Sequence, residues 1–277
     1  MFPLSGFSLV SLGANIPGPV AAARLRRLGA KVIKVESPAG DPLAHTCPAW
    51  YAVLCEGVEV LTIDLKTSSG RDTLHTLLSH SDLLLTATRP AGLQRLGLDW
   101  PTLHARYPRL CQVAILGYPL PNENVAGHDL TYQAALGLID PPHLPRTLIA
   151  DLAGAEQAIN AALALLLARE RGQGSGYAEV ALSAAAEDFA APLRYGLTAP
   201  NGLLGGRLPI YQLYQAQDGW LALAALEPHF AQRLMAKLNL TELTPAGLAT
   251  IFRTRPAGVW QQWALENDLP LMQVGQG

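Results

Sequence analysis

The sequence is poor in cysteine. Its three cysteines, Cys47, Cys55 and Cys111, form no CxxC pair and are too few for a disulfide framework in a chain of 277 residues. This scarcity excludes a small fold held together by disulfides. It favours a reducing environment, and we predict a cytoplasmic protein.

Charged residues are also scarce. They make up 15% of the chain, the formal net charge is −2, and lysine and arginine form no cluster. Nucleic acids and anionic membranes attract proteins through concentrated positive charge, which this sequence lacks. We therefore expect no nucleic-acid partner, and a few local residues must neutralise any anionic ligand.

Signals for secretion and membrane insertion are missing as well. The sequence does not open with a basic segment followed by an apolar run and a cleavage site. The longest apolar stretch, residues 161–168, is too short to cross a bilayer. These features predict a soluble protein with no membrane partner.

Hydrophobic residues, in contrast, are plentiful. They make up 49% of the chain, which is enough for a substantial core. Segments with helical spacing, such as residues 69–79 and those around Gln94 and Leu103, alternate with apolar runs typical of strands. These runs are FSLVSL (residues 7–12), KVIKVE, EVLTIDL, DLLLTA and LCQVAIL. The alternation predicts an α/β fold with a parallel sheet covered on both faces.

The second half of the chain predicts a long helix and then a second domain. The helix covers residues 151–170, with Asp151 as its cap and GQGSG at its end. The turn-rich residues 198–209 predict a boundary between a large domain, 1–197, and a small domain, 198–277. The small domain has a hairpin pattern with Asp218-Gly219 at the turn, followed by two or three helices, which predicts an α+β fold.

A glycine-rich loop, SLGANIPGP, follows the first predicted strand and opens a helix. It matches neither GxGxxG nor GxxxxGK[ST], so it predicts neither a dinucleotide fingerprint nor a P-loop. Two interpretations stay equally open: a tight strand-to-helix turn, and a loop that cradles a ligand.

Four residues could carry chemistry. His128 and Asp129 stand side by side at a predicted helix start, and Asp151 and Glu227 each stand at another. By itself, each carboxylate fits a helix cap or a first-turn acid, and the histidine fits a surface or packed position. As a set, an imidazole and separate carboxylates can remove a proton from one face of an acidic carbon and return one to the other.

Several motifs occur together in an order that resembles the class III CoA-transferase superfamily, of the CaiB/BaiF type. They are GPVAAARLRRLGAKVIKVESPAGDP, TIDLKTSSGRD, RPAGLQRLGLDW, AGHDLTYQAALGL, IADLAGA and LALAALEPHF, and they cover nearly all of the chain. The resemblance implies a Rossmann-like large domain, a small domain, and an interlocked homodimer whose sites lie between domains of the two subunits.

The resemblance also implies roles for the four residues. Aspartate at the position of Asp129 is the nucleophile of the transferases, which forms a mixed anhydride and then an enzyme thioester. The α-methylacyl-CoA racemase branch has a histidine directly before it, as His128 stands here. Similarity to that branch implies that His128 and Asp151 exchange the α-proton of a 2-methylacyl thioester through an enolate, with Glu227 in support. Backbone N–H groups near Asp129 are candidates to stabilise the enolate oxygen.

For coenzyme A, the resemblance implies contacts from four residues: Asn15, Ile16, Lys66 and Arg95. Arg89 is a further local candidate. Lysine and arginine suit the phosphate groups of CoA, although Lys66 and Arg95 also fit solvated charges at helix ends. CoA enters as part of the substrate, and we expect no prosthetic group and no metal.

The sequence departs from the family pattern in four places. CEGV at residues 55–58 replaces a basic segment, LGYP at 116–119 replaces a Ser-Gly-Phe-Gly type segment, and the Gly-rich linker reads NGLLGGR. The sequence ends at Gly277, where relatives continue through a long segment that returns to the large domain.

Three functions therefore stay open. The first is racemisation or epimerisation of a 2-methylacyl-CoA, and the second is CoA transfer between carboxylic acids through Asp129. The third is a non-catalytic acyl-CoA-binding or assembly protein, which the departures from the family pattern motivate.

Overall fold

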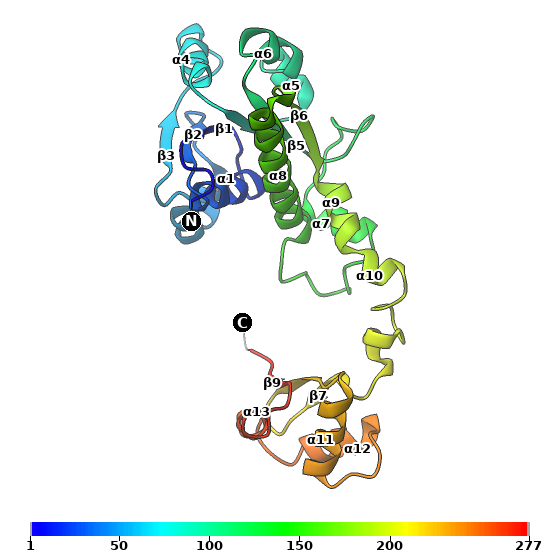
Figure 1. The fold of residues 1–277 in the computed structure, drawn as a ribbon. Coiled ribbons are helices and arrows are strands. Elements are labelled where there is room, and N and C mark those ends of the chain that lie inside the picture. Colours follow the sequence, from blue (N-terminus) through cyan, green and yellow to red (C-terminus); the bar gives the residue numbers. More distant parts are fainter. Residues whose placement is uncertain (1, 276–277) are drawn as a thin grey trace. The chain divides into compact units, whose positions relative to one another are not determined.

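The computed structural model describes residues 2–275. The chain divides into two compact units, residues 1–190 and residues 191–277, here named the first and the second unit (Figure 1). The sequence places its domain boundary after residue 197, and that boundary stays a prediction. Each unit has a sheet and a core of its own.

The first unit contains a six-stranded sheet in the order β3-β2-β1-β4-β5-β6, and every neighbouring pair is parallel. Its strands are β1 (Ser8–Ser11), β2 (Lys31–Glu36), β3 (Glu59–Thr62), β4 (Leu83–Thr86), β5 (Cys111–Leu116) and β6 (Tyr177–Ala181). The order 3-2-1-4-5-6 is that of doubly wound nucleotide-binding sheets. The predicted α/β class and Rossmann-like parallel sheet are thereby confirmed.

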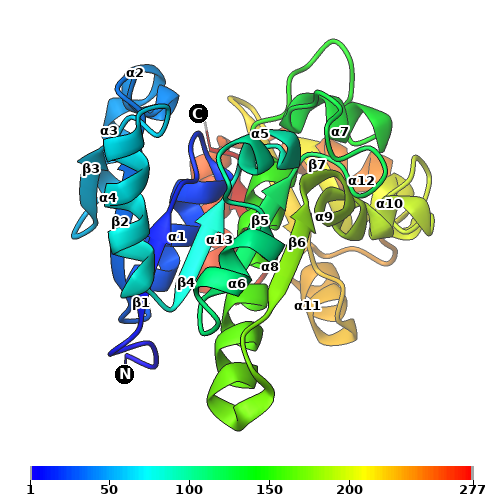
Figure 2. The same cartoon turned by 90° about the horizontal axis from the view of Figure 1, so that it is seen from above.

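Helices cover both faces of this sheet, because successive strand residues point to opposite sides. Leu83 and Leu85 join the core formed with α1 and α8, whereas Leu84 joins the core formed with α4 and α6. Figure 2 shows α1 and α8 on one side and α4 and α6 on the other. The helices of the first unit are α1 (Pro17–Arg27), α2 (Pro42–Thr46), α3 (Pro48–Leu54), α4 (Ser68–Ser79), α5 (Pro90–Arg95), α6 (Trp100–Arg106), α7 (Asp129–Ala135), α8 (Ile149–Ala168) and α9 (Leu182–Phe189).

Helix α8 corrects two expectations. It begins at Ile149, not at Asp151, and its N-cap residue, Leu148, makes no side-chain cap. With the helical turn η1 (Arg169–Gln173) it forms a continuous segment that is long and apolar enough, by length and composition alone, to cross a membrane. The apolar stretch of residues 161–168 therefore underestimated the length of this segment, because the helix extends well beyond the stretch. Core helices of soluble proteins pass the same test, and α8 packs against β5, β6, α1 and α9.

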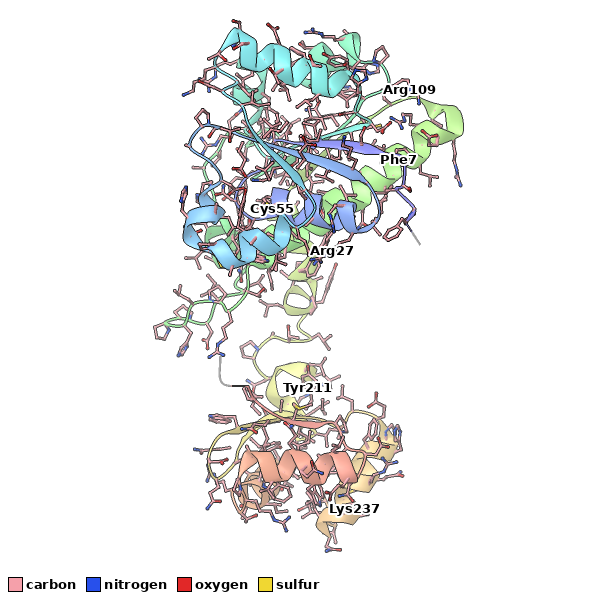
Figure 3. All side chains as sticks on the ribbon, turned by 90° about the vertical axis from the view of Figure 1, so that its left-hand side faces the viewer. Phe7, Arg27, Cys55, Arg109, Tyr211 and Lys237 are labelled. Carbon is pink, nitrogen blue, oxygen red and sulfur yellow. The ribbon has the colours of Figure 1, made fainter. Side chains whose placement is uncertain are left out.

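The end of α8 is anchored at the amino-terminal edge of the sheet. The buried guanidinium of Arg169 donates to Asp82 Oδ1 (2.8 Å) and to the carbonyl of Arg109 (3.0 Å), and it lies over the ring of Phe7. Figure 3 labels Phe7 and Arg109, which precede β1 and β5. The loops that carry most of the predicted site residues lie at the opposite, carboxyl-terminal edge of the sheet.

The second unit confirms the predicted hairpin. Strands β7 (Tyr211–Gln215) and β8 (Trp220–Ala224) pair antiparallel around the turn that contains Asp218, whose carboxylate accepts the N–H of Ala257 (2.7 Å). Phe252 and Trp260 are central to the core. The helices are α10 (Ala191–Arg194), α11 (Pro228–Leu238), α12 (Pro245–Phe252) and α13 (Ala257–Glu266), with a helical turn η2 (Leu203–Arg207). The sequence did not predict the third strand, β9 (Leu271–Gln273), which pairs with β8.

Candidate functional site

Two neighbouring cavities open at the carboxyl edge of the first unit's sheet. The first has a volume of about 270 Å³ and the second about 510 Å³, and Ala14 lines both. In open parallel sheets, ligands bind outside the carboxyl ends of the strands where the strand order reverses. That point lies between β1 and β4 here, and the loops that follow these two strands line the cavities.

The loop after β1 is a tight turn, and it also lines both cavities; the interpretation that it cradles a ligand stays a prediction. A Cβ atom on Gly13 would lie 2.6 Å from Cα of Gly18, which requires glycine at this close approach. Gly13 and Ala14 line the second cavity, and Ala14 and Asn15 line the first. Asn15 has a left-handed backbone (φ 64°), and its N–H donates to Asp41 Oδ1 at 3.0 Å.

Asp41 belongs to a buried ionic network that the sequence did not reveal. The ammonium of Lys34, whose residue is only 1% exposed, contacts Asp41 Oδ2 at 2.7 Å and also pairs with Glu36. The hydroxyl of Tyr51 donates to Glu36 at 2.7 Å, and burial, followed by this hydrogen bond, raises the pKa of Tyr51. The network fixes the Asn15 loop to β2, and its two acids and Lys34 line the second cavity.

The residues predicted to bind CoA are divided between the two cavities. Asn15 and Arg89 line the first, and Lys66 and Arg95 line the second. The three cations are exposed, and none forms an ion pair with another residue in the part of the chain that the structure describes. Ile16 lines neither cavity and packs instead against the core between the sheet and α1.

His128 and Asp151, far apart in sequence, line the same first cavity. His128 is the exposed N-cap residue of α7, and its backbone N–H donates to Thr131 Oγ1 at 3.1 Å. Asp151 is the third residue of α8. The packing of α7 against the start of α8 brings the imidazole-bearing and carboxyl-bearing positions to one cavity.

Asp151 has a strongly perturbed acidity. Burial, and then the negative charge of Asp129, raises its pKa from 3.8 to about 6, while His128 opposes this rise. Its side chain forms no hydrogen bond with any residue of the described part of the chain. A carboxyl group that titrates near neutral pH beside an imidazole is suited to proton transfer.

Asp129 does not line the cavity. It is 4% exposed, and its Oδ1 accepts the N–H groups of Ala150 (2.7 Å) and Asp151 (3.1 Å). Its Oδ2 accepts the side-chain amide of Gln133 (2.5 Å). Asp129 therefore caps α8 from the neighbouring helix, which is the role that the sequence assigned to Asp151. The correction has a plain reason: the free N–H groups of a helix start can be satisfied by a residue that only the tertiary fold brings near.

The sequence did not predict two further residues that line the first cavity, Tyr132 and Glu123. The buried Tyr132 points its hydroxyl between Gly117 and Gly127, where a Cβ atom would lie 2.5 Å or 2.7 Å from it. Burial is the main cause that raises the pKa of Tyr132 to about 12, so the hydroxyl stays protonated. Its spacing of four residues from His128 on one helix was an available signal. Glu123 lies in a loop and had no such signal.

Glu227 belongs to the second unit. It is the exposed N-cap residue of α11, which begins at Pro228 as the sequence predicts. Its role in catalysis stays a prediction. Within residues 2–275, no group of three or more His, Cys, Asp and Glu residues is arranged to hold a metal ion.

Comparison with known proteins identifies relatives across the whole chain. The model of CoA-transferase family III matches residues 4–274. The chain is 29% identical over 269 residues to the cinnamoyl-CoA:phenyllactate CoA-transferase of Clostridium sporogenes, and 30% identical over 260 residues to the α-methylacyl-CoA racemase of Homo sapiens. Both alignments cover 86% of this chain and 65% of the relative, so the chain spans less than two thirds of their length.

Solved structures share the fold. A hypothetical protein from Mycobacterium tuberculosis superposes with a TM-score of 0.85 at 24% identity, over 99% of this chain and 86% of that one. A CaiB/BaiF family protein from Brucella suis superposes with a TM-score of 0.80 at 22% identity, over 99% of this chain and 84% of that one. The fold and the match to the family model agree along the chain. This chain belongs to CoA-transferase family III.

Proposed function

We propose that the chain binds an acyl-CoA thioester and exchanges the proton on its α-carbon, as a racemase or epimerase of 2-methylacyl-CoA substrates. The CoA part would extend along the second cavity toward the exposed cations Lys66 and Arg95, and the thioester would lie in the first. Their shared wall at Ala14 supports a single elongated ligand across both.

The position of Asp129 is the observation that carries this choice of reaction. A nucleophile must present a free carboxylate oxygen to the thioester carbon. Both oxygens of Asp129 are engaged, one by two N–H groups at the start of α8 and the other by Gln133, and the residue is buried outside the cavity lining. His128 and Asp151 line the cavity instead, which favours proton transfer over CoA transfer.

The proposed chemistry uses one group on each side of the α-carbon. One of His128 and Asp151 removes the proton, the planar enolate forms, and the other group returns a proton to the opposite face. With a pKa of about 6, Asp151 has both protonation states accessible near neutral pH. The backbone N–H of Asp129, directly after His128, is the candidate donor to the enolate oxygen.

Glu227, the N-cap residue of α11 in the second unit, is the proposed supporting carboxylate, because the EPHF motif resembles the family at this position. An interlocked homodimer is the proposed assembly, and the cytoplasm the proposed location. The roles of Glu227 and of the homodimer rest on the family resemblance, and the location rests on the scarcity of cysteine.

CoA transfer through Asp129 is the second candidate, because a relative at 29% identity is named as a CoA-transferase. It requires Asp129 to leave its three hydrogen bonds. It predicts an acyl intermediate that hydroxylamine traps, and complete loss of turnover in Asp129→Asn.

The deciding experiment follows deuterium at the α-carbon. A single stereoisomer of a 2-methylacyl-CoA is incubated with the protein in deuterated water, and mass spectrometry and chiral analysis follow exchange and inversion. We expect one deuterium per molecule, loss of exchange in His128→Ala and Asp151→Asn, and residual exchange in Asp129→Asn. Acyl-CoA binding without exchange in the unaltered protein would refute the proposal and support a non-catalytic acyl-CoA-binding protein.

A further inference from the structure

Glu36 presents a carboxylate oxygen without a partner at the second cavity. The residue ends β2 and lines this cavity, and its side chain is 10% exposed. Its Oε1 accepts hydrogen bonds from the ammonium of Lys34 and the hydroxyl of Tyr51 (2.7 Å), whereas its Oε2 forms none with a described residue. An oxygen that has lost most of its water and has no partner costs free energy, which a bound donor would recover.

This free oxygen is accessible from the cavity. A Cβ atom on Gly40 would lie 3.8 Å from Oε2 of Glu36, and Gly40 lines the same cavity. The oxygen also keeps contact with solvent, in contrast to Oε2 of Glu123, which is fully closed off and without a partner. A ligand in the second cavity can therefore donate a hydrogen bond to Glu36.

Charge restricts the group that can occupy this place. Lys34 pairs with two carboxylates, Glu36 and Asp41, so one positive and two negative charges leave a net charge of −1. This charge repels phosphate, and a carboxylate oxygen accepts hydrogen bonds but donates none, so the partner must bring an O–H or an N–H. The exposed cations Lys66 and Arg95 line the same cavity and suit phosphate. The cavity is therefore suited to a ligand that carries a hydroxyl group near a phosphate.

The position of Glu36 agrees with the way in which doubly wound sheets bind ribose. In these folds an acid about 20 residues after the glycine-rich turn accepts the 2′-hydroxyl of the ribose. Glu36 stands 23 positions after Gly13 and ends β2, the strand that pairs with β1. The ribose of CoA has a free 2′-hydroxyl beside its 3′-phosphate, which is the combination that the charges of the cavity favour.

We propose that Glu36 determines specificity by accepting, through Oε2, a hydrogen bond from the 2′-hydroxyl of the CoA ribose. Lys34 and Tyr51 hold the other oxygen, so the carboxylate is oriented before the ligand binds. The 3′-phosphate then lies toward Lys66 and Arg95. The inference rests on the proposed function in one respect, namely that the nucleotide end of CoA occupies the second cavity.

The test compares CoA with 2′-deoxy-CoA, which lacks only the proposed donor. Isothermal titration calorimetry measures both affinities on the full 277-residue chain. We expect CoA to bind about tenfold more tightly, as a hydrogen bond to a charged acceptor allows. In Glu36→Ala the ratio of the two affinities falls to about one. Glu36→Gln keeps an acceptor oxygen for Lys34 and Tyr51 but not the charge, and its ratio falls to about threefold.

Asp64→Asn is the matched control, because Asp64 is another acid that lines the second cavity. It must leave the ratio at its original value, and circular dichroism must show the variants folded; if Glu36→Ala does not fold, Glu36→Gln decides. A tenfold ratio that persists in the Glu36 variants, or one that is lost in Asp64→Asn instead, overturns the inference. Equal affinity of the unaltered protein for the two ligands also overturns it and leaves the proposed function standing, because CoA still binds. Failure of both ligands to bind overturns the proposed function itself.

Discussion

Replacing Asp151 with asparagine is predicted to remove exchange activity and at the same time to stabilise the protein at neutral pH. Burial and the nearby charge of Asp129 raise the pKa of Asp151 from 3.8 to about 6, so the ionised form is disfavoured in the folded state. The side chain gains no hydrogen bond from described residues that would offset this. Asparagine has nearly the same shape and carries no charge.

The size and the pH range of the effect follow from that shift. Two pKa units correspond to an upper limit of about 3 kcal/mol, and residual contact with solvent reduces this to about 1–2 kcal/mol. Because the folded state binds the proton more tightly than the unfolded state, the stability of the unaltered protein falls as the pH rises from about 4 to about 6. The difference between variant and parent is therefore near zero below pH 4 and complete above pH 6.

Urea unfolding followed by circular dichroism at pH values between 4 and 8 measures this difference. Asp140→Asn is the matched control, because Asp140 is an exposed aspartate of the first unit. Its effect on the free energy of unfolding is expected to be small and independent of pH. If Asp151→Asn lowers the stability at pH 7, or changes it equally at every pH, the account of Asp151 as a half-buried acid with a raised pKa is wrong.

Four further predictions concern the elements around the two cavities. Asp129→Ala leaves two helix N–H groups without their acceptor and removes one of the two hydrogen bonds of the Gln133 amide, and it is expected to cost about 3 kcal/mol in urea unfolding. Asp129→Asn removes the charge that, after burial, raises the pKa of Asp151, and it is expected to move the acid limb of the exchange profile below pH 6. Gly13→Ala places a methyl group 2.6 Å from the backbone of a facing glycine, and thermal unfolding and CoA titration should show lower stability and at least tenfold weaker binding. Lys66→Ala and Arg95→Ala are each expected to weaken CoA binding by about tenfold and to reduce its salt dependence, whereas an unchanged affinity would assign these cations to solvent.

The two strands that the sequence missed, β6 and β9, were missed for different physical reasons. Strand β6 pairs only with β5, at the edge of the sheet, and three of its five residues are not buried. Strand β6 therefore lacks the continuous apolar run that identified β4 and β5, whose residues are all buried. Strand β9 is three residues long, too short for any periodicity to emerge.

The candidate site also has features that the sequence predicted and features that it did not. His128, Asp151 and the cations Lys66, Arg89 and Arg95 were singled out from the sequence, and the structure places all of them at the two cavities. The exchange of roles between Asp129 and Asp151 was not predicted, because the cap of α8 comes from a residue of another helix, 21 positions before Ala150. The ion pair between Lys34 and Asp41 was not predicted either, because these two residues meet beside the second cavity only when β2 and the following loop are folded.

The sequence by itself determined five of the six strands of the parallel sheet, the hairpin of the second unit and the family, since hydrophobic periodicity and motif order are properties of the chain alone. Only the tertiary structure decided which carboxylate lines a cavity and which one caps a helix. Two aspartates with similar local surroundings differ because one meets the N–H groups of a neighbouring helix and the other meets a cavity. That difference depends on packing between segments, which no local pattern encodes.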